Sequence, residues 1–340
     1  MDTTGAVSRS GILGYHGGVR LFVTGVTGFV GRHLAAFVSQ NRPDVEVWGV
    51  RRWRSSAAEE AGAPSGVRLL YADLLDPPSL VRALRVSRPD AVVHLAASSS
   101  VARSWETPTE MLQANVLGTV HLLEAVRQVE MEGPVVLACS AEAYGLVEPA
   151  ELPITEAQPF RPVSPYAVSK AAVDLLGFQY FRAFGVRTVR LRLFNHGGPG
   201  QSDHFVMAAF ARQLAEIEAG RRGPRLCVGN LEVQRDFVDV RDAARAYWLA
   251  VERGEPGEAY NVASGRARSL REMLAGLLAM SDAAVEVVTD PARLRPADVP
   301  VLAGTAEKFR HATGWRPEVP FDVTLRDTLD YWRQAVRRGQ

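Results

Sequence analysis

A glycine-rich turn places the tightest limit on how this chain folds. The apolar run Val19–Thr24 predicts a buried parallel strand, and it leads directly into Gly25, Gly28 and Gly31. The periodic segment Phe29–Val38 that follows predicts a helix. Glycines at this spacing let a strand turn sharply into a helix whose N-terminus holds a pyrophosphate. The order of strand, turn and helix therefore predicts the start of a dinucleotide-binding sheet.

Strand and helix patterns alternate through the first 195 residues. Further strands are predicted at Val45–Val50, Val67–Tyr71, Asp90–Leu95, Pro134–Ala138 and Val186–Leu193, with long helices near 107–127 and 165–184. This alternation predicts the α/β class and a doubly wound parallel sheet, the Rossmann architecture. A glycine-proline loop from His196 then breaks the pattern. We therefore predict a cofactor domain formed by 18–195 and 231–262, with a smaller α/β substrate domain formed by 196–230 and 263–340.

Composition excludes several classes of protein. The net charge is +1, which gives no reason to expect a nucleic-acid or anionic-membrane partner. No apolar run is long enough to span a bilayer. Cys139 and Cys227 lack metal-ligand spacing and lie in apolar runs, which predicts buried free thiols, no metal site and a reducing, cytoplasmic compartment. Residues 1–17 lack the apolar core of a signal peptide and predict a flexible leader.

Several residues around the turn are candidates for cofactor binding. Phe29 and Val30 begin the helix that follows the glycines, and Ala96-Ala97 ends a strand where small side chains let the backbone approach a cofactor. The second strand ends in Arg51 and Arg52, where an NAD site usually has an acid. Two cations there favour the 2′-phosphate of NADP(H), although NAD(H) or a merely solvated basic loop remains an alternative.

A tyrosine and a lysine four residues apart predict acid–base chemistry. Tyr166 and Lys170 lie about one turn apart on one helix face, and Pro165 before them suits a helix start. A nearby ammonium is expected to lower the pKa of the tyrosine toward the working range. Ser140 follows a predicted strand at the sheet edge where ligands bind, so its hydroxyl is expected to hold a substrate oxygen beside Tyr166.

Four ordered motifs carry a family resemblance. They are SPYAVSK at 164–170, FNHGGPGQ at 194–201, VGNLEVQRDFVDVRD at 228–242 and DPARLRPADVPVLAG at 290–304. From about Val19 onward the chain resembles the extended short-chain dehydrogenase/reductases of the nucleotide-sugar type, whose glycine turn also reads GxxGxxG. It is most similar to the GDP-4-keto-6-deoxy-D-mannose reductases and also resembles the GDP-mannose 4,6-dehydratases.

The resemblance implies specific roles and partners. It implies that Ser140, Tyr166 and Lys170 are catalytic and that Asp73-Leu74 meets the adenine. It also implies that a nucleotide-diphosphate sugar, with GDP favoured, is gripped at its diphosphate by Asn195, Arg235 and Arg295. A guanidinium suits this because it holds phosphate oxygens through two hydrogen bonds. Related proteins pair their two long helices across a two-fold axis, so a homodimer is expected.

Glu142 leaves the reaction open. It occupies the position of the base that removes the C5 proton in a dehydratase, but some related reductases also have an acid there, and it could instead bind a sugar hydroxyl. Ala141 before it disfavours the glucose-type dehydratases. An epimerase would need a second acid–base group, for which Asp203 and His204 are candidates, although both suit a helix cap or a surface position. A non-catalytic NADP-binding regulator would be expected to lack Tyr166 or Lys170. NADPH-dependent reduction of a C4 ketone is therefore the favoured reaction.

Overall fold

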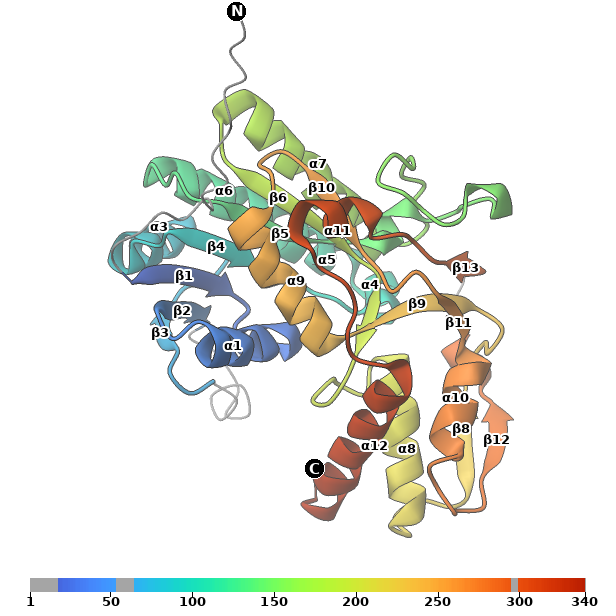
Figure 1. Cartoon of the computed structure of the whole chain (residues 1–340). Coiled ribbons are helices and arrows are strands. Elements are labelled where there is room, and N and C mark those ends of the chain that lie inside the picture. Colours follow the sequence, from blue (N-terminus) through green and yellow to red (C-terminus); the bar gives the residue numbers. More distant parts are fainter. Residues whose placement is uncertain (1–17, 53–63, 295–298, 340) are drawn as a thin grey trace, which may run out of the picture.

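A parallel sheet of seven strands forms the centre of the molecule (Figure 1). The computed structural model describes residues 18–52, 64–294 and 299–339. The strand order is β10-β6-β5-β4-β1-β2-β3. Their bounds are β1 (Val19–Thr24), β2 (Val45–Arg51), β3 (Arg68–Tyr71), β4 (Ala91–His94), β5 (Val135–Ser140), β6 (Thr188–Leu193) and β10 (Ala259–Val262). The chain runs outward from β1 in both directions, so the sheet has its switch point between β1 and β4.

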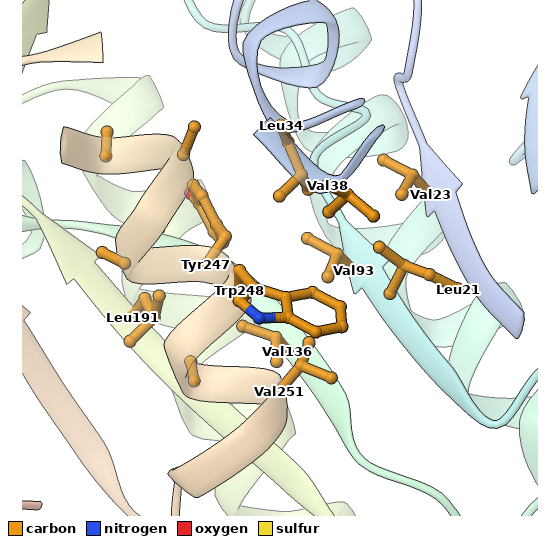
Figure 2. Packing of buried hydrophobic residues seen from close by; sticks show 14 of the residues in the cluster. Leu21, Val23, Leu34, Val38, Val93, Val136, Leu191, Tyr247, Trp248 and Val251 are labelled. Carbon is orange, nitrogen blue, oxygen red and sulfur yellow. The ribbon is translucent and has the colours of Figure 1, made fainter. Parts of the chain in front are cut away.

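Helices cover both faces of this sheet (Figure 1). On one face lie α1 (Phe29–Asn41), α9 (Val240–Arg253) and α11 (Glu307–Thr313). Tyr247 and Trp248 of α9 pack there among Leu34 and Val38 of α1 and the strand residue Val93 (Figure 2). On the other face lie α3 (Pro77–Ser87), α6 (Gly118–Gln128) and α7 (Pro165–Phe184). Because both faces are covered, the central strands β4 and β5 are largely apolar, as a parallel sheet requires, whereas β6 has the charged residues Arg190 and Arg192 in buried positions.

A second group of elements packs around its own apolar core. It includes β7 (Asn195–Gly197), β9 (Gln234–Asp239), β11 (Ala267–Ser269) and β13 (Val301–Leu302) in one sheet and β8 (Arg225–Val228) with β12 (Glu286–Thr289) in another. The helices α8 (Val206–Glu218), α10 (Leu270–Leu278) and α12 (Phe321–Arg337) pack with them. β9 thus lies in the smaller sheet, although its neighbours α9 and β10 belong to the large one. The exact domain division stays a prediction.

The turn after β1 needs its glycines. Gly25 has a φ of +73°, and a Cβ built on it would lie 2.8 Å from the backbone nitrogen of Ala96. A Cβ on Gly31 would lie 2.2 Å from the carbonyl oxygen of Gly25. Contacts this short are repulsive, so only glycine lets α1 start close against the ends of β1 and β4.

The predicted fold class is confirmed, with one informative difference in the helices. The helix expected near 107–127 is composite: α4 (Val101–Glu106) precedes α5 (Pro108–Leu112), and a π-helical turn at Gln113–Leu117 joins α5 to α6. Short 3₁₀ turns occur at Ala141–Tyr144, Pro149–Glu151 and Pro291–Arg293. Within the described residues, no helix is both long and apolar enough to cross a membrane. The leader predicted at 1–17 lies outside the described residues.

Candidate active site

The end of β5 and the start of α7 bring the predicted catalytic side chains together. Ser140 is the last residue of β5, and its hydroxyl accepts a hydrogen bond from the backbone N–H of Glu142 at 3.2 Å. Ser164 caps α7 by accepting from a backbone N–H of its first turn, and Pro165 occupies the first helical position. This start fixes where Tyr166 and Lys170 lie on the helix. Ser140 lies close enough to Tyr166 to lower the pKa of its phenol, although burial has the larger, opposite effect.

The environment of Tyr166 keeps its phenol protonated. Burial raises its pKa above the ordinary value of 10, and the negative charge of Glu142 raises it further, while the hydrogen bond with Ser140 lowers it. The prediction that the pKa of Tyr166 would be lowered is wrong, because burial, which raises this pKa, is the largest influence on it. The Nζ atom of Lys170 lies 5.9 Å from the centre of the Tyr166 ring and donates instead to the carbonyl of Ala138 at 2.7 Å. Tyr166 is therefore placed as a proton donor.

Lys170 is an unusual lysine because it is buried. Its exposed fraction is 5%, and burial lowers its pKa from 10.5 to about 8. The amine remains largely charged at neutral pH. This charge lowers the pKa of two nearby histidines, His94 and His196, to which burial makes the larger contribution. Lys170 is thus a positive centre enclosed by the end of the sheet.

A buried ionic cluster holds α7 against the sheet. Asp174, one turn beyond Lys170, accepts hydrogen bonds from Arg190 at 2.7 Å and from Arg192 at 2.8 Å, both on β6. Arg192 also donates to the hydroxyl of Tyr144 at 3.0 Å. Tyr144 lies in the 3₁₀ turn that contains Glu142. A carboxylate with two charged donors holds its geometry well, so this cluster ties the catalytic helix to the turn after Ser140.

The turn between β1 and α1 fits a dinucleotide. Phe29 and Val30 are the first residues of α1, and the residue before them, Gly28, has no side chain that could cap the helix. The first turn of α1 contains no acidic residue, so its N–H groups suit a pyrophosphate. Ala96 and Ala97 follow β4 directly opposite, and the amide of Ala96 lies close to Gly25. These residues lie at the switch point of the sheet, between the ends of β1 and β4.

The second and third strands bring the remaining predicted cofactor residues close together. Arg51 ends β2, and its guanidinium lies 4.6 Å from the centre of the Tyr71 ring at the end of β3. Arg52 follows it and is exposed. Asp73 lies just beyond β3 and accepts from the amide of Leu75 at 2.9 Å. The backbone oxygen of Leu74 contacts His121 of α6 at 2.7 Å.

The predicted substrate residues lie on or near the smaller sheet. Asn195 pairs with Phe237, which puts β7 beside β9. Arg235 is buried and donates to the carbonyl of Val299 at 2.7 Å. Asp236 accepts from the Ser264 hydroxyl at 2.6 Å. Arg235 is therefore a buried cation on β9. Arg295 lies outside the described residues.

Other predicted residues have ordinary structural roles. Asp203 forms an ion pair with Arg212 at 2.6 Å, and α8 is capped at Phe205 and not by Asp203 or His204. Cys139 is a buried free thiol as predicted. Cys227 is also free but only partly buried, so the prediction of full burial is wrong there.

Sequence reasoning missed one contact, which joins the start of α1 to the loop that follows Asn195. The ring of His196 stacks on Phe29, with centroids 6.2 Å apart and an interplanar angle of 5°. Nearby, Nε2 of His33 donates to the carbonyl of Pro199 at 3.0 Å. The loop that follows Asn195 therefore rests on the start of α1. Each ring lies in a motif that the sequence shows, Phe29 in the glycine turn and His196 in FNHGGPGQ. No spacing rule connects motifs so far apart, so their contact could not be predicted.

Comparison with known proteins agrees with this geometry. A protein of Pseudomonas aeruginosa named GDP-6-deoxy-D-mannose reductase is 40% identical over 318 residues, covering 94% of this chain and 98% of that relative. A GDP-mannose 4,6-dehydratase of Vibrio cholerae is 31% identical, covering 88% of this chain and 90% of its own. The structure of RMD from Pseudomonas aeruginosa complexed with NADPH matches with a TM-score of 0.80 at 38% identity, covering 93% and 99% of the two chains. A Thermus thermophilus UDP-glucose 4-epimerase complexed with NAD matches with a TM-score of 0.82 at 34% identity, covering 93% and 100%.

The doubly wound sheet and these neighbours define the class of protein, an extended short-chain dehydrogenase/reductase of the nucleotide-sugar type. The family model of GDP-mannose 4,6 dehydratase matches residues 22–328. The chain belongs to that family, and the predicted resemblance is confirmed.

The buried amine of Lys170 gives a testable dependence of stability on pH. The folded protein holds this group with a pKa of about 8 and the unfolded chain with one near 10.5. Between these values the unfolded chain binds more protons, so wild-type stability rises with pH through that window. Lys170→Met removes the group. We expect the stability advantage of Lys170→Met over wild type to shrink by roughly 3 kcal/mol between pH 7.5 and 10.5.

Urea unfolding of both proteins across this pH range measures the effect. The same substitution at Lys308, the half-exposed lysine of α11, is the control for loss of a lysine side chain. A difference between Lys170→Met and wild type that stays constant with pH would contradict the burial of a charged amine.

Proposed function

We propose that the chain is an NADPH-dependent reductase of a GDP-4-keto-6-deoxyhexose that converts its C4 ketone to an alcohol, as in the synthesis of GDP-rhamnose. The observation that carries this proposal is Tyr166, a partly buried phenol whose raised pKa keeps it protonated beside Ser140 and the charged Lys170. Carbonyl reduction needs a proton donor at the oxygen. The similarity to a GDP-6-deoxy-D-mannose reductase supports the substrate class.

The side chains divide the work of this reaction. Bound NADPH supplies the hydride. Tyr166 donates its phenolic proton to the substrate oxygen as negative charge develops there, and the Ser140 hydroxyl holds that oxygen. The charge of Lys170 stabilises the phenolate that remains. Each ketone reduced consumes one NADPH and one proton. Arg235, together with Asn195 and Arg295, binds the diphosphate and thereby orients C4.

The cofactor proposal rests on the ends of β2 and β3. Arg51 and Arg52 lie where an acid would bind the ribose diol of NAD, and cations there suit the 2′-phosphate of NADP. Asp73 and Leu74 follow β3, at the proposed adenine position. We propose that NADP(H) is preferred and that NAD(H) binds more weakly. Both cysteines of the chain, Cys139 and Cys227, are free thiols, which agrees with a cytoplasmic setting.

A dehydratase is the second candidate, because of Glu142. Its charge acts on the phenol of Tyr166, so it lies near the atom that would handle the substrate oxygen. A carboxylate there could remove the C5 proton of GDP-mannose, with a cofactor that is recycled. An epimerase is less favoured, since Asp203 is engaged by Arg212. A non-catalytic regulator is disfavoured by the presence of both Tyr166 and Lys170.

One assay with two variants separates these candidates. We expect wild type to consume NADPH when given GDP-4-keto-6-deoxymannose, with no solvent deuterium at C5. Tyr166→Phe should lower turnover by about 10²-fold or more, because the proton donor is lost.

Glu142→Gln should retain most of the reductase activity. Glu148→Gln, in the exposed segment that follows, is the control and should also retain it. Loss of NADPH absorbance is the measurement. Conversion of GDP-mannose without net NADPH loss, abolished by Glu142→Gln, would contradict the reductase and identify the dehydratase.

Cofactor choice is tested by reversing charge. Arg51→Glu with Arg52→Glu should weaken NADPH binding far more than NADH binding, since only NADPH has the 2′-phosphate. Fluorescence titration with each cofactor measures this. The pair Arg82→Glu with Arg85→Glu on α3 is the control, because both residues are exposed and the net charge changes equally. Equal losses for NADPH and NADH would identify a merely solvated basic pair.

We propose that the protein is a homodimer paired through α7 and the composite helix α5–α6. Exposed apolar side chains gather there, including Leu175, which is 59% exposed, and Phe178 on α7, with Leu112 and Leu117 on the neighbouring helix. Large exposed apolar side chains that gather on adjoining helices are typical of an interface. Helices of this kind pair across a two-fold axis in related proteins.

The dimer is tested at the centre of this surface. Leu175→Glu should convert the protein to a monomer at micromolar concentration, because a charge would be buried at the interface. Val86→Glu, at a comparably exposed position on α3, should leave the assembly unchanged. Analytical ultracentrifugation decides the matter. A wild type that sediments as a monomer would contradict the proposed interface.

A further inference from the structure

A chain of buried hydrogen bonds connects the cofactor turn to the catalytic helix. It begins where the amide of Ala96 donates to the hydroxyl of Thr24, at 3.2 Å, just before the glycine turn. Thr24 is 2.7 Å from Nδ1 of His94 on β4, and Nε2 of His94 is 3.1 Å from the hydroxyl of Thr119 on α6. Thr119 donates to the backbone oxygen of Asn115 at 2.6 Å. Every side chain in this chain of contacts is buried.

Asn115 continues the connection to α7. It lies in the π-helical turn at Gln113–Leu117, and such turns often mark functional sites. Its side-chain nitrogen donates to the hydroxyl of Ser169 at 2.9 Å and to the carbonyl of Ser98 at 2.9 Å. The hydroxyl of Ser169 in turn donates to the carbonyl of Tyr166 at 2.7 Å. Ser169 is the residue directly before Lys170.

The direction of every hydrogen in this chain follows from the contacts. The one hydrogen of the Thr119 hydroxyl goes to Asn115, so Thr119 accepts from His94 and the proton of the imidazole is on Nε2. Nδ1 is then an acceptor, and the Thr24 hydroxyl donates to it while accepting from Ala96. Burial, with a smaller contribution from Lys170, lowers the pKa of His94 to about 3, so the imidazole stays neutral.

We propose that His94 and Thr119 are positioning residues that fix the catalytic helix α7 relative to the cofactor turn by way of Asn115. The proposal rests on the proposed function in that Tyr166 is taken as the proton donor. In the proposed reaction, the hydride passes from a cofactor held by the turn after β1 to a substrate held beside α7. The distance between these two elements therefore affects the rate. A rate is sensitive to errors of about 1 Å in such a distance.

The alternative is that these hydroxyls only stabilise the core. Thr119→Val tests this, because it keeps the shape of the side chain and removes its hydroxyl. Thr119→Ser keeps the hydroxyl and is the rescue variant. Thr328→Val on α12 is the matched control, since the Thr328 hydroxyl is buried and donates to the carbonyl four residues earlier, as that of Thr119 does.

We expect Thr119→Val to lower kcat by about tenfold or more while changing the KM for NADPH by less than about twofold. Amide hydrogen exchange between Val168 and Asp174 should become faster in Thr119→Val than in wild type. Thr119→Ser should restore both values, and Thr328→Val should lower the unfolding temperature without changing either. Thr24→Val breaks the same chain from its other end and replaces Thr119→Val if that variant does not fold.

A Thr119→Val protein with wild-type kcat and wild-type exchange in α7, but a lowered unfolding temperature, would overturn the proposal. If wild type neither reduces the keto sugar nor dehydrates GDP-mannose, the proposed function fails. The exchange measurement still decides the positioning role in that case, because it requires no turnover.

Discussion

The desolvation of Tyr166 and Lys170 is the constraint on which the chemistry of this site depends. In water, a tyrosine releases its proton slightly before a lysine does. In this fold the order is reversed, because burial raises the pKa of Tyr166 and lowers that of Lys170 to about 8. At neutral pH the site therefore contains an intact phenol beside a charged amine. This state favours donation of a proton, which is what reduction of a carbonyl requires.

Enclosing a charge of this kind costs stability, and the surrounding structure compensates for it. The carbonyl of Ala138 accepts from Lys170, and the next turn of α7 is held by Asp174 with two arginines of β6. Asp174 and the two arginines are paired with each other, whereas Lys170 is stabilised by its hydrogen bond to the neutral carbonyl. The same strand pairs with β5, which ends at Ser140. Strand β6 therefore stabilises both the catalytic helix α7 and the turn after Ser140.

The sequence was informative wherever a local rule applied. The glycine turn, the strands near it and the helix Pro165–Phe184 were predictable because strand periodicity, turn chemistry and a proline start are local signals. The π-helical turn at Gln113–Leu117 was not, since a single inserted residue leaves helical periodicity almost unchanged. The raised pKa of Tyr166 was also missed, because burial depends on packing by distant segments. The stack of Phe29 on His196 has the same cause.

The position of α9 in the chain has a consequence for synthesis on the ribosome. This helix covers the face of β4, β5 and β6 with Tyr247 and Trp248, yet β6 is complete some fifty residues before α9 begins. The edge strand β10 follows later still, after the chain has left for the smaller sheet and returned. Until then the nascent sheet has an uncovered apolar face and an open edge, the features that invite aggregation. A chaperone that shields nascent apolar surface would act over this interval, and a chain cut before Val240 would retain the exposed face permanently.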